Sequence, residues 1–271
     1  MTNIERTLSK KPKTWIMNTV FFTILLAAVI YSFNGSTVNM LRFNSIIYTI
    51  RVILKDVVKI QVDLFFGRGD YLFVEGVIYL TIVTLAIGFL GTLIGAVLAL
   101  PFGFLASKNV VGKKAAKFGE AILVVIRVFP EIILALIIVK GFGMNPLTGV
   151  LTIGLHSIGM LGKLFAESID NMDKSSLEAL DAVGANIYQK IRFGIIPQIA
   201  ADLSSITLYR LDINVRSATV LGIIGAGGLG ALLNLSAENS QWAMLGTCMI
   251  GIVVMVLVVD AISSRLRAKL V

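Results

Sequence analysis

Long apolar segments recur along the chain and leave little room for a water-soluble fold. Hydrophobic residues make up 56% of the sequence and charged residues only 15%, which is too little polar surface for a soluble protein of this length. A helix needs about 20 apolar residues to cross a bilayer. Six segments qualify: residues 17–33, 71–106, 121–139, 147–165, 199–224 and 242–262. The sequence therefore predicts an all-α, polytopic membrane protein with about six transmembrane helices.

The basic residues predict how these spans are oriented. Lys and Arg favour the cytoplasmic side of a membrane, and their larger groups precede the first span and follow the second, fourth and sixth. These groups are Arg6, Lys10, Lys11 and Lys13; Lys108, Lys113, Lys114 and Lys117; Lys174, Lys190 and Arg192; and Arg265, Arg267 and Lys269. We expect a multi-pass protein of the cytoplasmic membrane with both termini inside. The net charge of +8 lies in span flanks, so nucleic acid is not an expected partner.

Residues 44–66 predict an external amphipathic helix rather than a span. Arg51, Lys55 and Lys59 recur every four residues on one face, with apolar residues on the remainder. Such a helix lies at the membrane interface or contacts a partner. The first span is interpreted as an anchor, because no small-x-small cleavage site follows it. We therefore divide the chain into residues 1–70, with the anchor and amphipathic helices, and residues 71–271, the core transmembrane domain.

Gly225, Gly227 and Gly230 spell G-x-G-x-x-G, but the context predicts a turn rather than a nucleotide site. A dinucleotide fingerprint needs a preceding strand and a later acidic residue, whereas this motif lies between two apolar spans. We expect a glycine turn at the outer membrane face. The chain has one His and one Cys, so we expect no disulfide, no metal site and no cofactor bound by this chain.

A stripe of small residues predicts close packing of the second span. It consists of Thr81, Thr84, Gly88, Gly91, Gly95 and Ala99. Small side chains let two helix backbones approach closely in lipid. A break of this long span near its glycines is the alternative.

Residues 171–197, between the fourth and fifth spans, are the most specific feature of the sequence. They contain Glu178-Ala179-Leu180, then Gly184, then Pro197. This pattern predicts a short helix, a glycine break, a second short helix and a proline stop. Such a rigid knob on the inner face would transmit force from a soluble partner to the spans. An ordinary loop with helical character is the alternative.

At these residues the chain resembles the permease subunits of binding-protein-dependent ABC importers. The coupling loop of that family carries Glu-Ala-Ala, a Gly four residues later and a Pro thirteen residues after the Gly. Glu178, Ala179, Gly184 and Pro197 fall on this frame, whereas Leu180 replaces the second Ala. Residues 127–131, 156–163 and 208–216 are similar to the phosphonate-importer branch. The resemblance covers residue 71 to the C-terminus.

The resemblance implies a type I permease fold and a set of partners. One partner is a second permease copy, with which this chain would form a homodimer. Two cytoplasmic ATPase subunits would bind ATP and Mg and dock on residues 171–197. An extracytoplasmic substrate-binding protein is the last partner. It also implies that this chain is a transport subunit surrounded by membrane lipid, and not an enzyme. The implied substrate is a phosphonate-like oxyanion: a phosphonate, phosphite or phosphate ester.

Ionisable side chains inside the spans must pair or face a cavity, because an unpaired charge in lipid is costly. Three pairs are four residues apart: Arg127 with Glu131, Lys163 with Glu167, and Asp212 with Arg216. We expect the first two to lock helices together. The fifth span is more polar than packing requires and predicts a translocation path lined by Tyr209, Arg210, Asp212, Asn214 and Arg216. Secondary candidates are Arg127, Glu131, His156 and Lys163, and His156 is expected to be a hydrogen-bonded structural residue.

Three alternatives to an oxyanion importer remain at this point. An importer of the same architecture would carry methionine or a quaternary amine, although a cationic solute is disfavoured beside Arg210 and Arg216. A secondary transporter needs no coupling loop and usually shows internal repeats, which we do not recognise in the sequence. A membrane enzyme needs a nucleophile–base pair or a metal cluster, for which one His and one Cys offer few candidates.

Overall fold

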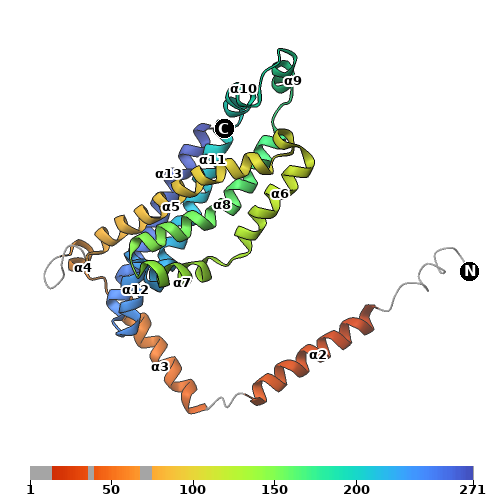
Figure 1. Ribbon diagram of the computed structural model, residues 1–271. Coiled ribbons are helices and arrows are strands. Elements are labelled where there is room, and N and C mark those ends of the chain that lie inside the picture. Colours follow the sequence, from red (N-terminus) through yellow and green to blue (C-terminus); the bar gives the residue numbers. More distant parts are fainter. Residues whose placement is uncertain (1–13, 36–39, 68–74, 271) are drawn as a thin grey trace, which may run out of the picture. The chain divides into compact units, whose positions relative to one another are not determined.

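The computed structural model describes residues 14–35, 40–67 and 75–270, and every regular element in these ranges is a helix (Figure 1). The all-α fold class is therefore confirmed. The chain forms two compact units, Met1–Leu54 and Lys55–Val271. The first contains α2 (Thr14–Gly35) and most of α3 (Met40–Val57). The basic residues predicted to hold the N-terminus inside, Arg6, Lys10, Lys11 and Lys13, lie outside the described residues, as does the start of the second predicted span.

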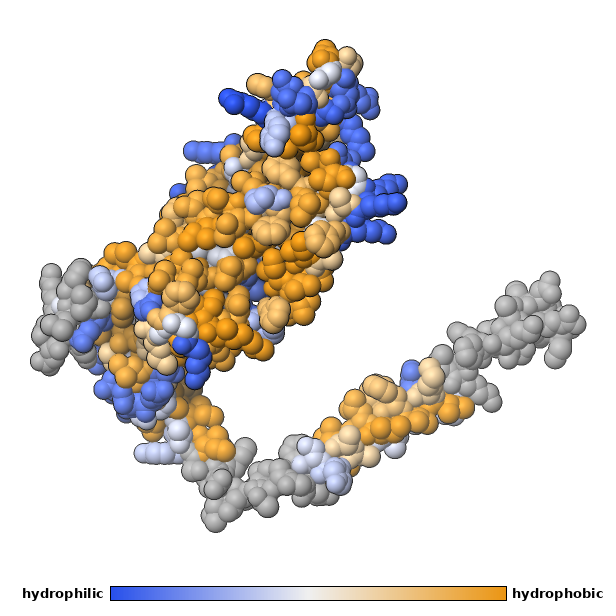
Figure 2. Space-filling model, in the orientation of Figure 1, coloured by the Kyte–Doolittle hydropathy of each residue, from blue (hydrophilic) through white to orange (hydrophobic). Residues whose placement is uncertain are grey.

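Four helices in the described part of the chain are long and apolar enough to cross a membrane. They are α2, α5 (Val77–Ala106), α8 (Pro146–Asn171) and α13 (Trp242–Leu270). Two bent pairs bring the number to six: α6 (Lys108–Val128) with α7 (Glu131–Phe142), and Ile187–Ala226 with α12 (Gly228–Glu238). On the face in Figure 2, hydrophobic residues cover the middle of the Lys55–Val271 unit and hydrophilic residues gather at its ends. A bundle surrounded by lipid requires this distribution.

The predicted span 121–139 is not one continuous helix, because the helix breaks at Pro130. α6 ends at Val128, α7 begins at Glu131, and the two are bent by 78°. Phe129 has φ −69° and ψ 120°, the extended conformation that a following proline imposes. Pro130 also has no N–H to donate to the preceding turn. The third span is therefore a broken helix.

The glycine motif is a turn, as predicted, but the last span does not follow it directly. α11 (Ile196–Leu221) runs into a π-helical turn, η3 (Gly222–Ala226). Gly225, Gly227 and Gly228 then adopt positive φ angles of 107°, 80° and 70°, which glycine tolerates far better than other residues. The unpredicted helix α12 intervenes before α13. A contact remote in sequence fixes its start, since the Leu229 N–H donates to Thr84 Oγ1 of α5 at 2.9 Å.

The prediction of one amphipathic helix over residues 44–66 is also wrong. α3 ends at Val57 and a separate short helix, α4 (Val62–Phe66), follows. Between them the Gln61 N–H donates to Thr247 Oγ1 of α13 at 3.0 Å. This contact holds the connecting backbone out of the helical pattern. Arg51, Lys55 and Lys59 are exposed, as predicted.

The core of the second unit is the packing of α5 along α8. A Cβ atom on Gly91 would lie 2.7 Å from Ile153 Cγ2, and one on Gly95 would lie 2.7 Å from Ser157 Cβ. The two helices are therefore as close as glycine allows, which confirms the predicted packing stripe. α5 is continuous through these glycines, so the alternative of a break there is wrong.

We expect Gly95→Ala to destabilise the protein by about 1–3 kcal/mol, the typical effect of overpacking a close interface. The added methyl group would meet Ser157 Cβ and the Gly154 carbonyl oxygen at 2.7 and 2.9 Å. Gly141→Ala is the matched control, because its Cβ meets nothing within 4 Å and alanine favours a helix. Thermal unfolding of the detergent-solubilised protein checks both. Equal midpoints for the two variants would contradict the close contact.

Candidate functional site

Arg210 lies on α11 and is held by three residues of α8. Its Nε donates to Ser157 Oγ at 3.2 Å, its Nη1 donates to Met160 Sδ at 3.0 Å, and its Nη2 lies 3.0 Å from His156 Nδ1. These partners share one face of α8 because they are one and four residues apart. Arg210 is only 5% exposed, so this cation is buried, and its three hydrogen-bond partners on α8 include no carboxylate.

Asn214, one turn further along α11, joins three helices. Its Nδ2 donates to Thr92 Oγ1 of α5 at 2.8 Å and to Ser157 Oγ of α8 at 2.9 Å. All three side chains are buried. Asn214 Oδ1 is buried with no hydrogen-bond partner among the described residues. Asn214 thus has an acceptor left for a further donor.

Glu131 approaches the same region from the first turn of α7. Its Oε2 accepts a hydrogen bond from Ser217 Oγ at 3.1 Å and lies 4.0 Å from His156 Nδ1, while its Oε1 is buried without a partner among the described residues. The expected helical pair of Arg127 with Glu131 is wrong, because the break at Pro130 lies between them. The break instead turns Glu131 toward α8 and α11.

A second polar stripe of α11 faces a different direction. The predicted ion pair between Asp212 and Arg216 is present. Asp212 is buried, whereas the Arg216 side chain is 54% exposed. Tyr209 is also exposed, and the Arg267 guanidinium of α13 lies over its ring at 5.9 Å. The five predicted residues of the fifth span therefore divide into a buried pair, Arg210 and Asn214, and a stripe of Tyr209, Asp212 and Arg216.

Lys163 and Arg127 meet in a third polar cluster between α6 and α8. Lys163 pairs with Glu167 at 3.3 Å, as predicted, and with Glu120 at 3.7 Å. Glu120 also pairs with Lys108 at 3.7 Å. Arg127, Glu120 and Lys163 line a cavity of about 90 Å³. Sequence reasoning missed Glu120, because its partners come from other parts of the chain.

Residues 171–197 form the predicted knob. α9 (Ser175–Ala182) ends before Gly184, which has φ 72°, and α10 (Ile187–Gln189) continues as a π-helical turn, η2 (Lys190–Ile195). An ion pair between Lys190 and Asp181 joins the two halves, and a capping box of Asn186 and Gln189 begins α10. The expected proline stop is wrong: Pro197 lies in the first turn of α11, where its missing N–H has no intrahelical partner anyway.

The knob presents apolar side chains to its surroundings. Val183, Tyr188 and Phe193 are 79%, 80% and 65% exposed, and Glu178 and Ala179 are exposed on α9. Hydrogen bonds from the Ser175 hydroxyl and backbone N–H hold the pKa of Asp173, just before α9, below its ordinary value. Figure 1 shows α9 and α10 at the same end of the second unit as the C-terminus. An exposed apolar surface on an ordered helical knob is suited to bind another protein.

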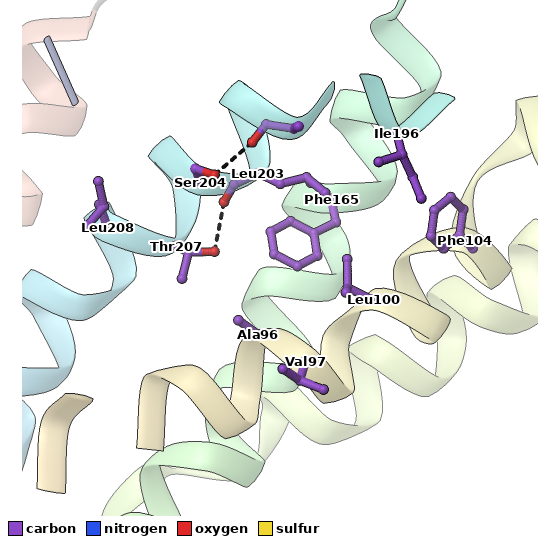
Figure 3. Close-up of a pocket in the computed structure, with 11 residues that line it drawn as sticks. Ala96, Val97, Leu100, Phe104, Phe165, Ile196, Leu203, Ser204, Thr207 and Leu208 are labelled. Atoms are coloured by element: carbon purple, nitrogen blue, oxygen red, sulfur yellow. Dashed lines mark hydrogen bonds between the residues drawn. The ribbon is translucent and has the colours of Figure 1, made fainter. Parts of the chain in front are cut away.

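A cavity of about 550 Å³ lies between α5, α8 and α11 and is apolar (Figure 3). Its two hydroxyl groups donate within α11, from Ser204 to the Ala200 carbonyl and from Thr207 to the Leu203 carbonyl. The remaining lining is aliphatic or aromatic, including Phe104 and Phe165. This cavity is suited to an acyl chain or a hydrophobic side chain and offers no group that would hold an anion.

The described residues thus form an all-helical bundle with membrane-spanning helices, buried polar groups where α5, α8 and α11 meet, and an exposed helical knob at one end. Residues 99–271, more than half of the chain, match the family of binding-protein-dependent transport system inner membrane components. The chain belongs to this family. The resemblance to this family is thereby confirmed.

Two relatives and one solved structure illustrate the likeness. HtxE of Stutzerimonas stutzeri, named for a phosphite transport system permease, is 44% identical over 146 residues, 54% of this chain and 56% of HtxE. The phosphate-import permease PhnE of Mycolicibacterium smegmatis is 36% identical over 189 residues, 69% of this chain and 36% of PhnE. The match thus spans less than two thirds of either relative. The inward-facing MetNI methionine ABC transporter has a TM-score of 0.64 at 20% identity, over 72% of this chain and 96% of that one.

We expect Arg216→Ala to destabilise the protein by about 1–3 kcal/mol, because it leaves the buried Asp212 carboxylate without its partner. Asp212→Asn removes that charge, so the double variant Asp212→Asn/Arg216→Ala should recover part of the loss. Thermal unfolding of Arg216→Ala, Asp212→Asn and the double variant, compared with the wild type, completes a double-mutant cycle. A double variant whose loss equals the sum of the single losses would show that the pair is not coupled.

Proposed function

We propose that this chain is the membrane-spanning permease subunit of an ATP-driven importer for a phosphorus oxyanion, namely a phosphonate, phosphite or phosphate ester. The observation that carries the proposal is the ordered knob of residues 171–197 on a chain of this transport family. Relatives named for phosphite and phosphate transport support the substrate class.

The charges of α11 are compatible with such a substrate. Arg210 and Arg216 carry two positive charges, and Asp212 pairs with Arg216 alone. Arg210 hydrogen-bonds to a hydroxyl, a thioether and an imidazole, and the Glu131 carboxylate lies beyond that imidazole, 4.0 Å from His156 Nδ1. A guanidinium holds phosphorus oxygens through two parallel hydrogen bonds. In the proposed path, Tyr209 and Arg216 are accessible in the present packing, and Arg210 becomes accessible when α8 and α11 separate.

The partners follow from the same proposal. Two cytoplasmic ATPase subunits would dock on Glu178, Ala179 and the exposed apolar residues of the knob, and would bind the ATP and Mg. A second copy of this chain would complete the path as a homodimer, with both termini cytoplasmic. An extracytoplasmic binding protein would deliver the solute. Nucleotide closure would push the knob, and the spans would alternate between outward-open and inward-open cavities.

Methionine is the second candidate substrate, since a methionine transporter has the same fold. At 20% identity that likeness supports the architecture and not the solute. A quaternary amine is disfavoured by the two arginines of α11. A secondary transporter is disfavoured because the family is one of binding-protein-dependent systems.

The proposal is tested in proteoliposomes that contain the permease, its ATPase and its binding protein. We expect ATP-dependent uptake of phosphite or methylphosphonate and none of methionine. Omission of ATP is the control, because a secondary transporter would continue to move the solute. Uptake of methionine without uptake of any phosphorus oxyanion would overturn the substrate assignment and leave the permease assignment in place.

Gly184→Trp should separate ATP hydrolysis from uptake. At Gly184 φ is 72° and a Cβ would meet nothing within 4 Å, so the indole would project from the knob into the proposed docking surface. Gly184→Ala is the matched control, because it carries the same backbone strain, about 1 kcal/mol, without the bulk. We expect normal uptake per assembled complex in the alanine variant and a large loss in the tryptophan variant. Normal uptake in both would make the knob incidental to coupling.

A further inference from the structure

The turn between α5 and α6 is fastened to the last turn of α8 by four hydrogen bonds. Asp170 Oδ1 accepts from Ser107 Oγ at 2.6 Å and from the Asn109 N–H at 3.1 Å. In return, Asn109 Nδ2 donates to the Ile169 carbonyl at 3.2 Å and to the Asp170 carbonyl at 2.9 Å. Ser107 is fully buried. We refer to Ser107, Asn109 and Asp170 as the Asp170 clamp.

The clamp caps two helices reciprocally. α8 ends at Asn171, so the carbonyls of Ile169 and Asp170 are among those without an intrahelical donor. Asn109 supplies that donor. α6 begins at Lys108, so the Asn109 N–H is among those without an intrahelical acceptor, and the Asp170 carboxylate supplies it next to the positive end of the helix. Neither helix end is complete without the other.

An apolar cluster extends the clamp to the knob. Ile169, Ile195 and Ile199 are each 1% exposed. The side chains packed against them come from both sides of the connection: Phe104 and Val110 from the α5–α6 region, and Leu177 and Ile191 from the knob. Packed side chains, as well as the hydrogen bonds, therefore connect the knob to the α5–α6 turn, so a displacement of the knob would push on that turn.

Gly112 marks the far limit of the clamped segment. It has φ 78° and ψ 164° inside α6, a conformation that is essentially restricted to glycine. A Cβ there would meet nothing within 4 Å, so packing is not the reason for glycine. The backbone geometry divides α6 into a short clamped turn, residues 108–111, and the longer part that carries Glu120 and Arg127.

We propose that the Asp170 clamp passes movements of the knob to the α5–α6 turn, and that Gly112 is the hinge about which the rest of α6 then turns. Ser107, Asn109 and Asp170 are positioning residues in this scheme. The proposal rests on the proposed function, because it takes the knob as the docking element of the ATPase. It adds a route by which nucleotide binding reaches α6, to which the knob makes no hydrogen bond or ion pair among the described residues.

The test uses the complex of permease and ATPase and compares Asp170→Asn with Asp202→Asn. Both substitutions remove one negative charge near the end of α8. The Asp202 carboxylate lies on α11, outside the knob, and accepts from Ser168 Oγ at 3.1 Å, so its loss leaves the clamp intact. The first measurement is the hydrogen exchange of residues 107–112 with and without a non-hydrolysable ATP analogue. The second is solute taken up per ATP hydrolysed.

We expect ATP-dependent exchange at residues 107–112 in the wild type and in Asp202→Asn, and its loss in Asp170→Asn. Uptake per ATP should fall about tenfold in Asp170→Asn, within the usual range for disrupted coupling. A merely structural cap would lower the unfolding temperature without changing either measurement, and that result would overturn the proposal. If Asp170→Asn does not assemble, the same two measurements are made on Asn109→Ala. This variant removes only the two hydrogen bonds from Asn109 Nδ2 to the Ile169 and Asp170 carbonyls.

The two proposals fail in different ways. Exchange that responds to nucleotide in a wild-type complex without oxyanion uptake would reject the substrate and support the clamp. Oxyanion uptake with unchanged coupling in Asp170→Asn would reject the clamp and support the substrate.

Discussion

The absence of water in the bilayer is the constraint on which the rest of the structure depends. A polar group in the middle of α8 or α11 must find its partner inside the protein. Asn214 does so by bridging Thr92 and Ser157, and this bridge is short enough only because Gly91 and Gly95 let α5 lie directly on α8. The close packing of α5 on α8 at these glycines is therefore what allows the buried polar bridge to form.

Broken helices bring further polar groups to this centre. A continuous helix from α6 into α7 would keep Glu131 on the face of Arg127, whereas the break at Pro130 turns it toward Ser217 and His156. The glycine turn after α11 is a second break, at which the chain bends by 56° and continues as α12. Irregular backbone at membrane depth is tolerated where protein or a cavity surrounds it. The two breaks thus set which charges meet.

The sequence predicted features that depend on neighbouring residues. Hydropathy placed α5, α8 and α13, helical spacing gave the pairs Lys163–Glu167 and Asp212–Arg216, and Gly184 marked the break in the knob. It failed where a contact remote in sequence decides. The α3–α4 break depends on Thr247, the start of α12 depends on Thr84, and the clamp joins residues more than sixty positions apart. Pro130 was a local signal that the apolar pattern around it obscured.

The burial of Arg210 links substrate binding to helix movement in the proposed transporter. In the present packing its three hydrogen-bond partners all belong to α8, and separating α11 from α8 would leave the guanidinium without them in a poorly hydrated interior. An oxyanion offers charge-assisted hydrogen bonds that replace these contacts. The open arrangement is then favoured by the solute itself, because a ligand shifts a conformational equilibrium by its difference in affinity for the two states. Arg216, already paired and half exposed, needs no such movement. The two arginines of one helix would therefore act in sequence: Arg216 attracts the anion in either state, and Arg210 binds it only when the helices part.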